Sequence, residues 1–189
     1  MNILLKRTQK YRVFPTRSQI SNLENQLSMC RYLWNWSLSE RMDFYAHSGG
    51  SLNYYHQALG LSILKQNRPW FKGVFSQTLQ DVLKRLQKGY DNFYRRVKEG
   101  AEDPGFPKFK KRGDWSSLTF PQYRKSPASK ITVPKIGTLK LKFHRDLPDG
   151  AKIKTLTIEK DAGKWFACFS FEFRLEAEPK PRSPFRRRH

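Results

Sequence analysis

The sequence has few cysteines and no long apolar run. Its two cysteines, Cys30 and Cys168, lie far apart within apolar patterns, and neither is part of a CxxC pair. This argues against a structural zinc site and favours a reducing, intracellular compartment. No stretch approaches the roughly 18 apolar residues of a membrane-spanning helix, and the apolar run at the N-terminus is too short for a secretory signal. We therefore expect a cytoplasmic protein with no membrane partner.

Acidic residues are also scarce, 16 against 37 Lys and Arg, and they show no catalytic arrangement. A nuclease that cuts through metal ions needs two or three carboxylates that converge on one point. Here the acids are dispersed, and only Glu159 and Glu172 fall well inside the predicted barrel pattern. The histidines lack metal-ligand spacing, and there is no phosphate-binding GxxxxGK[ST] loop. We predict no catalytic residue, no metal ligand and no cofactor in this chain.

What the sequence does contain is positive charge combined with aromatic residues. The net charge is +21, and 14% of the residues are aromatic. A disordered basic tail would be poor in aromatic residues, so this chain is expected to fold despite its self-repulsion. Phosphates would neutralise that repulsion, and no predicted helix has the broad apolar face of a membrane-surface helix. The composition therefore favours a nucleic-acid partner.

The segment 76–112 joins an amphipathic helix to a basic, aromatic loop. Ser76 is the predicted N-cap of the helix, and Gly100 is the predicted residue just after its end. Apolar residues at steps of three and four predict one stripe: Leu79, Val82, Leu83, Leu86, Tyr90, Phe93, Tyr94 and Val97. Cations lie off the stripe and continue into GFPKFKKR: Lys84, Arg85, Lys88, Arg95, Arg96, Lys98, Lys108, Lys110, Lys111 and Arg112. A polyanion-binding surface and an ordinary solvated basic face both fit this pattern.

One strand and a long helix are predicted at the start of the chain. Residues 3–14 have the loose alternation of a strand. Thr16 and Gln19 form a capping-box pattern that opens a helix of about seven or eight turns, ending before Ser48. Trp34 lies on the apolar stripe of this helix, so we expect its ring in the core.

A second helix is predicted over residues 53–66, with Asn53 as its N-cap. Its apolar residues share one face: Tyr55, Leu59 and Ile63. Tyr54 points elsewhere, and the proline at position 69 breaks the pattern.

After Gly113 the apolar pattern changes from period 3.6 to period 2. Five short strands are predicted, with turn signals between them: 117–120, 131–133, 138–143, 153–158 and 165–173. Such spacing suggests a small closed barrel or a sandwich that the first strand completes, with the helices inserted between barrel strands. Lys140 and Lys142 share the face opposite the apolar residues of their strand, which fits both a phosphate contact and simple solubility.

Several motifs occur in an order that resembles a known family. They are KRTQKYRVFPTRSQ, CRYLWNWSLSER, PWF followed by SQTLQDVLKRLQKGYDNFYRR, GFPKFKKR, LTFPQ, ITVPKIGTLKLKFHR and GKWFACFSFEF. In sequence and spacing they resemble the N-terminal half of the TnpB proteins of IS200/IS605 transposons, which are RNA-guided nucleases related to the Cas12 effectors. The resemblance covers roughly residues 5–175.

The resemblance implies an α+β fold, in which a small oligonucleotide-binding-like β-barrel, the wedge domain, is interrupted by a mainly helical recognition insertion. In this chain the barrel would comprise residues 1–15 and 105–176 and the insertion residues 16–104, while residues 177–189 would form a Pro/Arg-rich tail or linker. By similarity, the barrel and GFPKFKKR would hold a guide RNA scaffold. The insertion would straddle the guide–target heteroduplex and read a short motif in duplex DNA.

The positions that match the family's motif readers are Tyr54, Ser76, Gln80, Phe120, Pro121 and Gln122. A glutamine amide makes a bidentate contact to an adenine edge in the major groove, which favours Gln80 among them. Ser76 replaces a longer cation, and Pro121 has no donor, so the sequence departs from the family pattern there. The expected contacts to the RNA and heteroduplex backbone are Lys84, Arg85, Lys88, Arg95, Arg96, Lys108, Lys110, Lys111, Arg112, Lys140 and Lys142.

The main departure from the family is the lack of a RuvC-like nuclease domain after the barrel, since the sequence stops at PRSPFRRRH. We expect binding to guide RNA and target duplex DNA without cutting by this chain, in the cytoplasm of a prokaryote and at its nucleoid. A separate RuvC-containing chain, with its own divalent metal, would complete a split effector; a repressor and a truncated remnant also fit. Two other classes remain open: an unguided helix-turn-helix DNA-binding regulator and a ribosomal-type structural RNA-binding protein.

Overall fold

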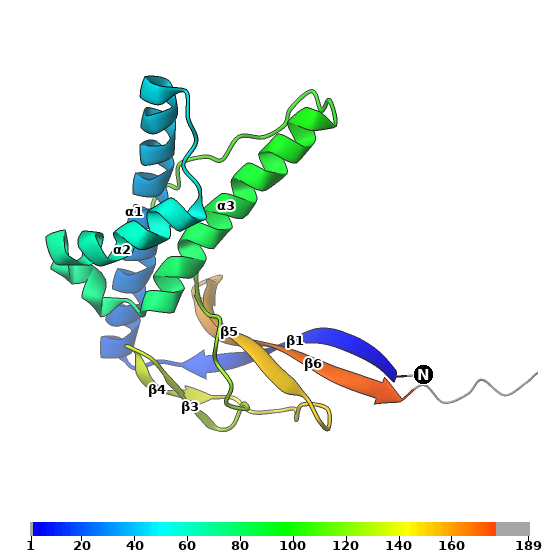
Figure 1. Cartoon of the computed structure of the whole chain (residues 1–189). Helices are drawn as coiled ribbons and strands as arrows, with labels where there is room; N and C mark the ends of the chain where they lie inside the picture. Colours follow the sequence, from blue (N-terminus) through cyan, green and yellow to red (C-terminus); the bar gives the residue numbers. More distant parts are fainter. Residues whose placement is uncertain (1, 177–189) are drawn as a thin grey trace, which may run out of the picture.

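Strands at both ends of the described chain build one antiparallel sheet in the computed structural model, which describes residues 2–176 (Figure 1). The predicted tail 177–189 lies outside the described residues. The strands are β1 (Asn2–Phe14), β2 (Ser117–Phe120), β3 (Lys130–Val133), β4 (Gly137–Leu141), β5 (Lys152–Asp161) and β6 (Lys164–Glu176). Between β1 and β2 lie α1 (Arg17–Ser48), α2 (Tyr54–Asn67), the short 3-10 helix η1 (Pro69–Gly73) and α3 (Ser76–Lys98). The predicted helical insertion between sheet strands is confirmed.

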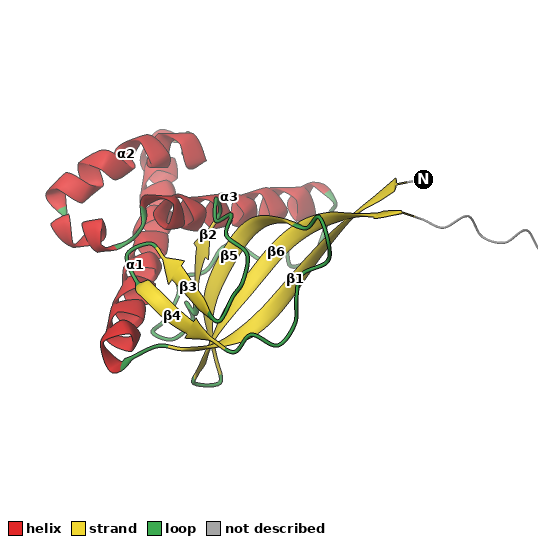
Figure 2. Ribbon diagram, turned by 90° about the horizontal axis from the view of Figure 1, so that it is seen from below, coloured by secondary structure: helices red, strands yellow, loops and turns green. Residues whose placement is uncertain are grey.

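The sheet has the strand order β2-β5-β6-β1-β4-β3 and curls into a half-barrel (Figure 2). The first strand pairs with the last along its length, from Asn2 opposite Glu176 to Val13 opposite Trp165. At its end β1 also pairs with β4, where Val13 lies opposite Leu141. The mixed fold with a barrel-like sheet is confirmed. Closure is not found, because the edge strands β2 and β3 are not hydrogen-bonded to each other.

Alternation places apolar residues of the strands on the face that packs into the core, with one register shift in β5 between Ile153 and Thr155. Leu118, Leu139, Leu156, Ile158 and Phe169 are each fully buried. The residues between them project from the other face, where lysines meet the few carboxylates of the sheet. Their ion pairs are Lys10 with Glu159 at 2.7 Å, Lys154 with Glu172 at 2.8 Å and Lys6 with Glu172 at 3.2 Å. Hydrogen bonds from Lys154 and Lys6 lower the pKa of Glu172.

The long helix α1 begins at the predicted capping box. The Thr16 hydroxyl accepts from the Gln19 amide at 3.3 Å, and the Thr16 amide donates to the Gln19 side chain at 2.9 Å. The helix is 32 residues long, longer than predicted, and ends at Gly49 with a left-handed φ of 67°. Trp34 is 8% exposed, which confirms its place in the core.

Helix α3 differs from the sequence prediction in its N-cap and in how far its apolar stripe is buried. Its N-cap is Phe75, which makes no side-chain capping bond, whereas the Ser76 hydroxyl accepts a hydrogen bond from Lys65 at 2.6 Å; the prediction of Ser76 as N-cap was wrong. The apolar stripe is buried only as far as Tyr90, and Tyr94 and Val97 are 53% and 50% exposed. Figure 1 gives the reason, because the last turns of α3 project away from the sheet. At the C-terminal end Gly100 has a left-handed φ of 73°, as its predicted position requires.

Helix α2 starts after its predicted N-cap, since the Asn53 side chain accepts from the amides of Tyr55 and His56. Its expected apolar face, however, is turned to solvent: Tyr55, Leu59 and Ile63 are 72%, 79% and 60% exposed. The helix packs through the opposite side, which buries Gln57, Leu61 and Leu64. Spacing alone identified residues that share a face but not the face that is covered.

Alanine substitution at the two predicted N-caps, Thr16 of α1 and Ser76 of α3, tests which side chain stabilises its helix. Thr16→Ala is expected to lower the free energy of unfolding by about 1 kcal/mol, because it removes the N-cap acceptor of α1. Ser76→Ala should change it by less than about 0.5 kcal/mol, because Ser76 is exposed and caps nothing. Urea denaturation followed by circular dichroism measures both, and equal losses would contradict this assignment of the caps.

Candidate nucleic-acid interface

The first turn of α3 is fixed against the end of β2. The Thr78 hydroxyl donates to the Thr119 carbonyl at 2.8 Å, and the Gln77 amide donates to the Gln122 side chain at 2.6 Å. Thr78 is buried, whereas Gln122 is exposed. Residues 45 positions apart in the sequence therefore meet at the start of α3, and Gln122 is placed beside that turn.

A row of exposed polar residues runs along α3 from this turn. Ser76, Gln80, Lys84 and Lys88 recur at steps of four, which places them on one side of the helix, and all four are exposed. The Lys84 ammonium lies 5.6 Å from the centre of the Tyr54 ring on α2. We call this row, together with Tyr54 and Gln122, the α3 surface. It gathers four of the six motif-reading positions that the resemblance implied.

The other two motif-reading positions, Phe120 and Pro121, are not part of the α3 surface. Phe120 is 1% exposed, and its ring stacks on Phe75 with 6.0 Å between the centroids. Its side chain belongs to the core and is not available to a ligand, so Phe120 is corrected from a contact to a residue that positions its neighbours. Pro121 is partly exposed and offers no donor.

Lys65 is a cation at the α3 surface that sequence reasoning missed. It reaches from α2 to the Ser76 hydroxyl, and its pKa is lowered by burial and by the nearby charge of Lys135. Eleven residues separate Lys65 from Ser76, and no local pattern connects them. Only the packing of α2 against α3 reveals that the Lys65 ammonium lies at the Ser76 hydroxyl.

Arg85 is committed to the fold and is not a free cation. Its guanidinium pairs with Asp81 at 2.7 Å and donates to the hydroxyls of Ser117 at 3.0 Å and Thr119 at 2.5 Å. It also lies 5.3 Å from the centre of the Trp115 ring. Arg85 therefore ties α3 to β2, and its expected role as a backbone contact is corrected to that of a structural clamp.

The loop 105–112 is held in place along α1 by side chains of the WNW motif. The Asn35 side chain accepts from the Lys110 amide at 2.8 Å and donates to the Lys110 carbonyl at 3.0 Å, as a neighbouring strand would. The Trp34 indole donates to the Lys108 carbonyl at 3.0 Å. The Lys110 ammonium lies 5.7 Å from the Trp34 ring. The backbone of the loop is thus fixed while its cations extend from it.

Two arginines at the end of α3 are partly engaged. Arg96 donates to the carbonyls of Pro104 at 2.6 Å and Gly105 at 3.1 Å, so it supports the start of the loop. Arg95 pairs with Glu99 at 2.8 Å, with both side chains more than half exposed, and such a pair adds little stability. Within residues 2–176, no ion pair engages the remaining exposed cations of the expected set: Lys84, Lys88, Lys108, Lys111, Arg112, Lys140 and Lys142.

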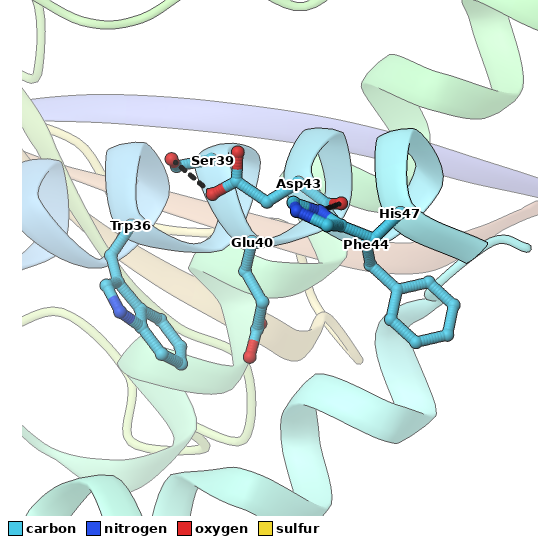
Figure 3. Close-up of a pocket in the computed structure, with 6 residues that line it drawn as sticks. All are labelled: Trp36, Ser39, Glu40, Asp43, Phe44 and His47. Atoms are coloured by element: carbon cyan, nitrogen blue, oxygen red, sulfur yellow. Dashed lines mark hydrogen bonds between the residues drawn. The ribbon is translucent and has the colours of Figure 1, made fainter. Parts of the chain in front are cut away.

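An acidic face of α1 contrasts with these basic surfaces (Figure 3). Ser39 donates to the Asp43 carboxylate at 3.2 Å, and Glu40 lies one turn from Phe44 in the same shallow hollow. A ring nitrogen of His47 lies 2.7 Å from the backbone carbonyl of Asp43, so His47 bonds to the backbone and not to the Asp43 carboxylate. Ser39, Asp43 and His47 therefore form no nucleophile relay. The carboxylates repel phosphate, and this face is unsuited to a polyanion.

The described residues also limit metal and thiol chemistry. Among residues 2–176 no group of three His, Cys, Asp or Glu side chains is placed to hold a metal ion. Burial raises the pKa of both the Cys30 and the Cys168 thiol to about 12, so neither is a reactive thiolate near neutral pH. In the same range, no helix has the length and apolar character needed to cross a membrane.

Asn35→Ala is expected to release the loop 105–112. Hydrogen exchange of the Lys110 amide should accelerate at least about fivefold, because a hydrogen bond that contributes about 1 kcal/mol is lost. Asn22→Ala is the matched control, since Asn22 lies on the same helix and bonds to the carbonyl of Lys135. Unchanged exchange at Lys110 in Asn35→Ala would show that Asn35 does not hold the loop.

Comparison with known proteins places this arrangement in context. Residues 1–50 match the OrfB/IS605 family described as "Helix-turn-helix domain"; the described part of that segment holds β1, α1 and the residue that caps α1. The protein "Putative RNA-guided DNA endonuclease InsQ" of Escherichia coli (strain K12) is 28% identical over 94% of this chain and 44% of its own length. A "Putative RNA-guided DNA endonuclease" of Streptomyces pristinaespiralis is 27% identical over 93% of this chain and 44% of its own.

A solved structure with a similar chain is the cryo-EM structure of the Cas12f1-sgRNA-target DNA complex. It has 15% sequence identity and a TM-score of 0.43, over 93% of this chain and 49% of that one. The chain spans less than half the length of the curated relatives it matches. The resemblance drawn from the order of motifs is confirmed by the family match and by the two curated relatives. Over nearly its whole length the chain is homologous to part of the InsQ protein, and its residues 1–50 match the OrfB/IS605 helix-turn-helix family.

Proposed function

We propose that this chain is an RNA-guided DNA-recognition module that binds the scaffold of a guide RNA and reads a short DNA motif beside the target. The observation that carries the proposal is the α3 surface, where exposed amide and hydroxyl groups line one side of a helix next to cations without ion pairs. Homology to proteins named as RNA-guided DNA endonucleases supports the choice of partners. The edge strand β2 holds this surface in place through hydrogen bonds of Thr119 with Thr78 and Arg85.

Base reading is assigned to Gln80 and its neighbours. The Gln80 side chain is exposed and central in the row, and its amide has the donor and acceptor that match an adenine edge. Lys65 reaches the row from α2 and Lys84 lies within it, and their ammonium groups meet Ser76 and Tyr54 respectively. These cations would contact DNA phosphates and fix the register of the helix, which leaves sequence selection to the amides.

RNA binding is assigned to the loop 105–112 and the neighbouring sheet. Because Asn35 and Trp34 fix the loop backbone, the Lys108, Lys111 and Arg112 side chains lose less freedom on binding than they would on a mobile loop. Each phosphate that they neutralise releases counterions, so binding should depend steeply on salt. Lys140 on β4 and Lys142 just after it are also exposed, and we assign them further phosphate contacts.

Cleavage is not assigned to the described residues. The relatives are named as endonucleases, and this chain corresponds to 44% of their length. Residues 2–176 hold no cluster of metal-binding side chains. We therefore propose that cutting, where it occurs, depends on a RuvC-type domain and its divalent metal outside these 189 residues.

The test of the function is purification of the chain from its native host, followed by sequencing of the nucleic acid bound to it. We expect one structured RNA to be enriched over total RNA, and duplex binding to be lost after ribonuclease treatment. Tight, sequence-specific duplex binding that survives ribonuclease would instead favour an unguided regulator. Co-sedimentation with ribosomes, without enrichment of a single RNA, would favour a ribosomal-type protein.

Gln80→Ala is expected to reduce discrimination among target-flanking sequences by about 1–3 kcal/mol, the value of one bidentate base contact. Affinity for the guide RNA should not change, because the side chain lies on α3 and away from the loop. The measurement is binding of the RNA-loaded chain to duplexes that differ only in the flanking motif. Asn25→Ala, which removes an exposed side-chain amide of α1, is the control, and equal discrimination in both variants would refute the role of Gln80.

Replacing Lys108, Lys110 and Lys111 together with Ala should weaken RNA binding across all sequences and flatten its dependence on salt. Each lost phosphate contact lowers the slope of log K against log salt by about 0.7–0.9. A control with the same loss of charge replaces Lys72, Lys130 and Lys152, which are exposed on other elements. If both triple variants show the same slope, the loop has no special part in binding phosphate.

A further inference from the structure

A groove of about 560 Å³ lies between α1, α3, residues 51–53 that lead into α2, and Phe106 of the loop 105–112. Its size falls within the range of small-ligand sites, and its lining is rich in aromatic residues. Tyr45 and Tyr94 stand on opposite helices and are 64% and 53% exposed. Phe106 from the loop is 40% exposed and meets Tyr90 edge-on at 5.4 Å. The function proposed above does not use this groove.

A buried cation lines the groove beside these rings. Arg41 is only 4% exposed, and its guanidinium lies 5.0 Å from the centre of the Tyr90 ring. Its Nε donates to the Gln57 side chain at 2.9 Å, but its Nη2 is buried and has no hydrogen-bond partner. Burial lowers the pKa of Arg41. A buried cation with an unused donor is costly unless an acceptor reaches it, so this side of the groove is suited to a ligand acceptor.

The surroundings hold Arg41 in position for such a ligand. Gln57 accepts from Arg41, and its own amide donates to the Ser37 carbonyl at 2.9 Å and the Glu40 carboxylate at 2.7 Å. The Asp91 carboxylate accepts from Gln87 at 2.8 Å. Both carboxylates act on Arg41 through space and not through a direct hydrogen bond. Their negative charge disfavours a phosphate in the groove and favours a neutral group with acceptor atoms.

We propose that this groove binds one unstacked nucleobase of a single-stranded nucleic acid, with guanine preferred. The base stacks against Tyr45 or Tyr94, and Arg41 donates to its O6 and N7, the acceptor pair that guanidinium groups recognise. The net charge of +21 and the unpaired cations Lys108 and Lys111 on the adjoining loop would hold the flanking phosphates. The proposal rests on the proposed nucleic-acid function and adds a base-binding site to it.

The test uses the full chain and fluorescence anisotropy with single strands of about 12 abasic residues that carry one central guanine, one 7-deazaguanine or no base. The guanine strand should bind about tenfold more tightly than the strand with no base, because one stacked base is gained. The 7-deazaguanine strand should lie between them, since N7 is lost. Ribose and deoxyribose versions show whether the base comes from RNA or from single-stranded DNA.

Tyr45→Ala combined with Tyr94→Ala should abolish the preference for the guanine strand and leave binding of the base-free strand unchanged. Both side chains are exposed, so the fold should persist. Phe44→Ala is the matched control, an aromatic residue of α1 with 42% exposure that lies outside the groove, and it should keep the tenfold ratio. Arg41→Met, if folded, should remove the difference between guanine and 7-deazaguanine.

The outcomes separate this inference from the proposed function. Equal binding of the guanine and base-free strands by the unaltered chain would overturn the base site and leave phosphate binding intact. A preference for guanine that survives the double tyrosine variant would also overturn it. Failure to bind even the base-free strand at low salt would overturn the nucleic-acid function as well.

Discussion

In the central part of the sheet, β1 and β6 run antiparallel along the whole of β1, and Arg12 and Phe166 lie opposite each other near one end. Every other element depends on this pairing. It brings together segments about 150 residues apart, and the cost of closing such a loop grows only slowly with its length. Because α1 begins three residues after β1 ends, the pairing also fixes the point from which the helices leave the sheet. The chain returns to the sheet at β2, which packs against the first turn of α3, where the candidate motif-reading residues lie.

The uneven placement of the carboxylates decides where a polyanion can bind. On the outer face of the sheet, Glu159 and Glu172 offset the charges of Lys6, Lys10 and Lys154. Further carboxylates line the α1 face shown in Figure 3. The α3 surface and the loop 105–112 are left with their cations uncompensated. Cations that no carboxylate offsets therefore line the helix–sheet joint, where they would attract a polyanion.

Local sequence patterns predicted most elements of the fold but few of the contacts that build the site. Alternation identified the strands, and the Thr16 capping box identified the start of α1, because both signals lie within a few residues. The pairing of Asn35 with the backbone of Lys110 spans 75 positions and has no local signal. The sequence pattern placed Arg85 among the cations of a basic helix face, and only the structure shows its hydrogen bonds to β2. Periodicity likewise could not show that burial of the apolar stripe of α3 stops at Tyr90.

The loop 105–112 links the two binding surfaces physically. Its lysines extend from a backbone fixed by Asn35, and in the same loop Phe106 packs edge-on against Phe93 at 5.2 Å, where it forms one wall of the aromatic groove. A phosphate held by Lys108 thus restrains a segment only two residues from that wall. Because Asn35 and Trp34 already fix the loop backbone, the groove wall formed by Phe106 is in place before a ligand binds. A strand whose phosphate is held at Lys108 is thereby kept near the groove, so backbone binding and base binding are expected to reinforce each other although different residues make the contacts.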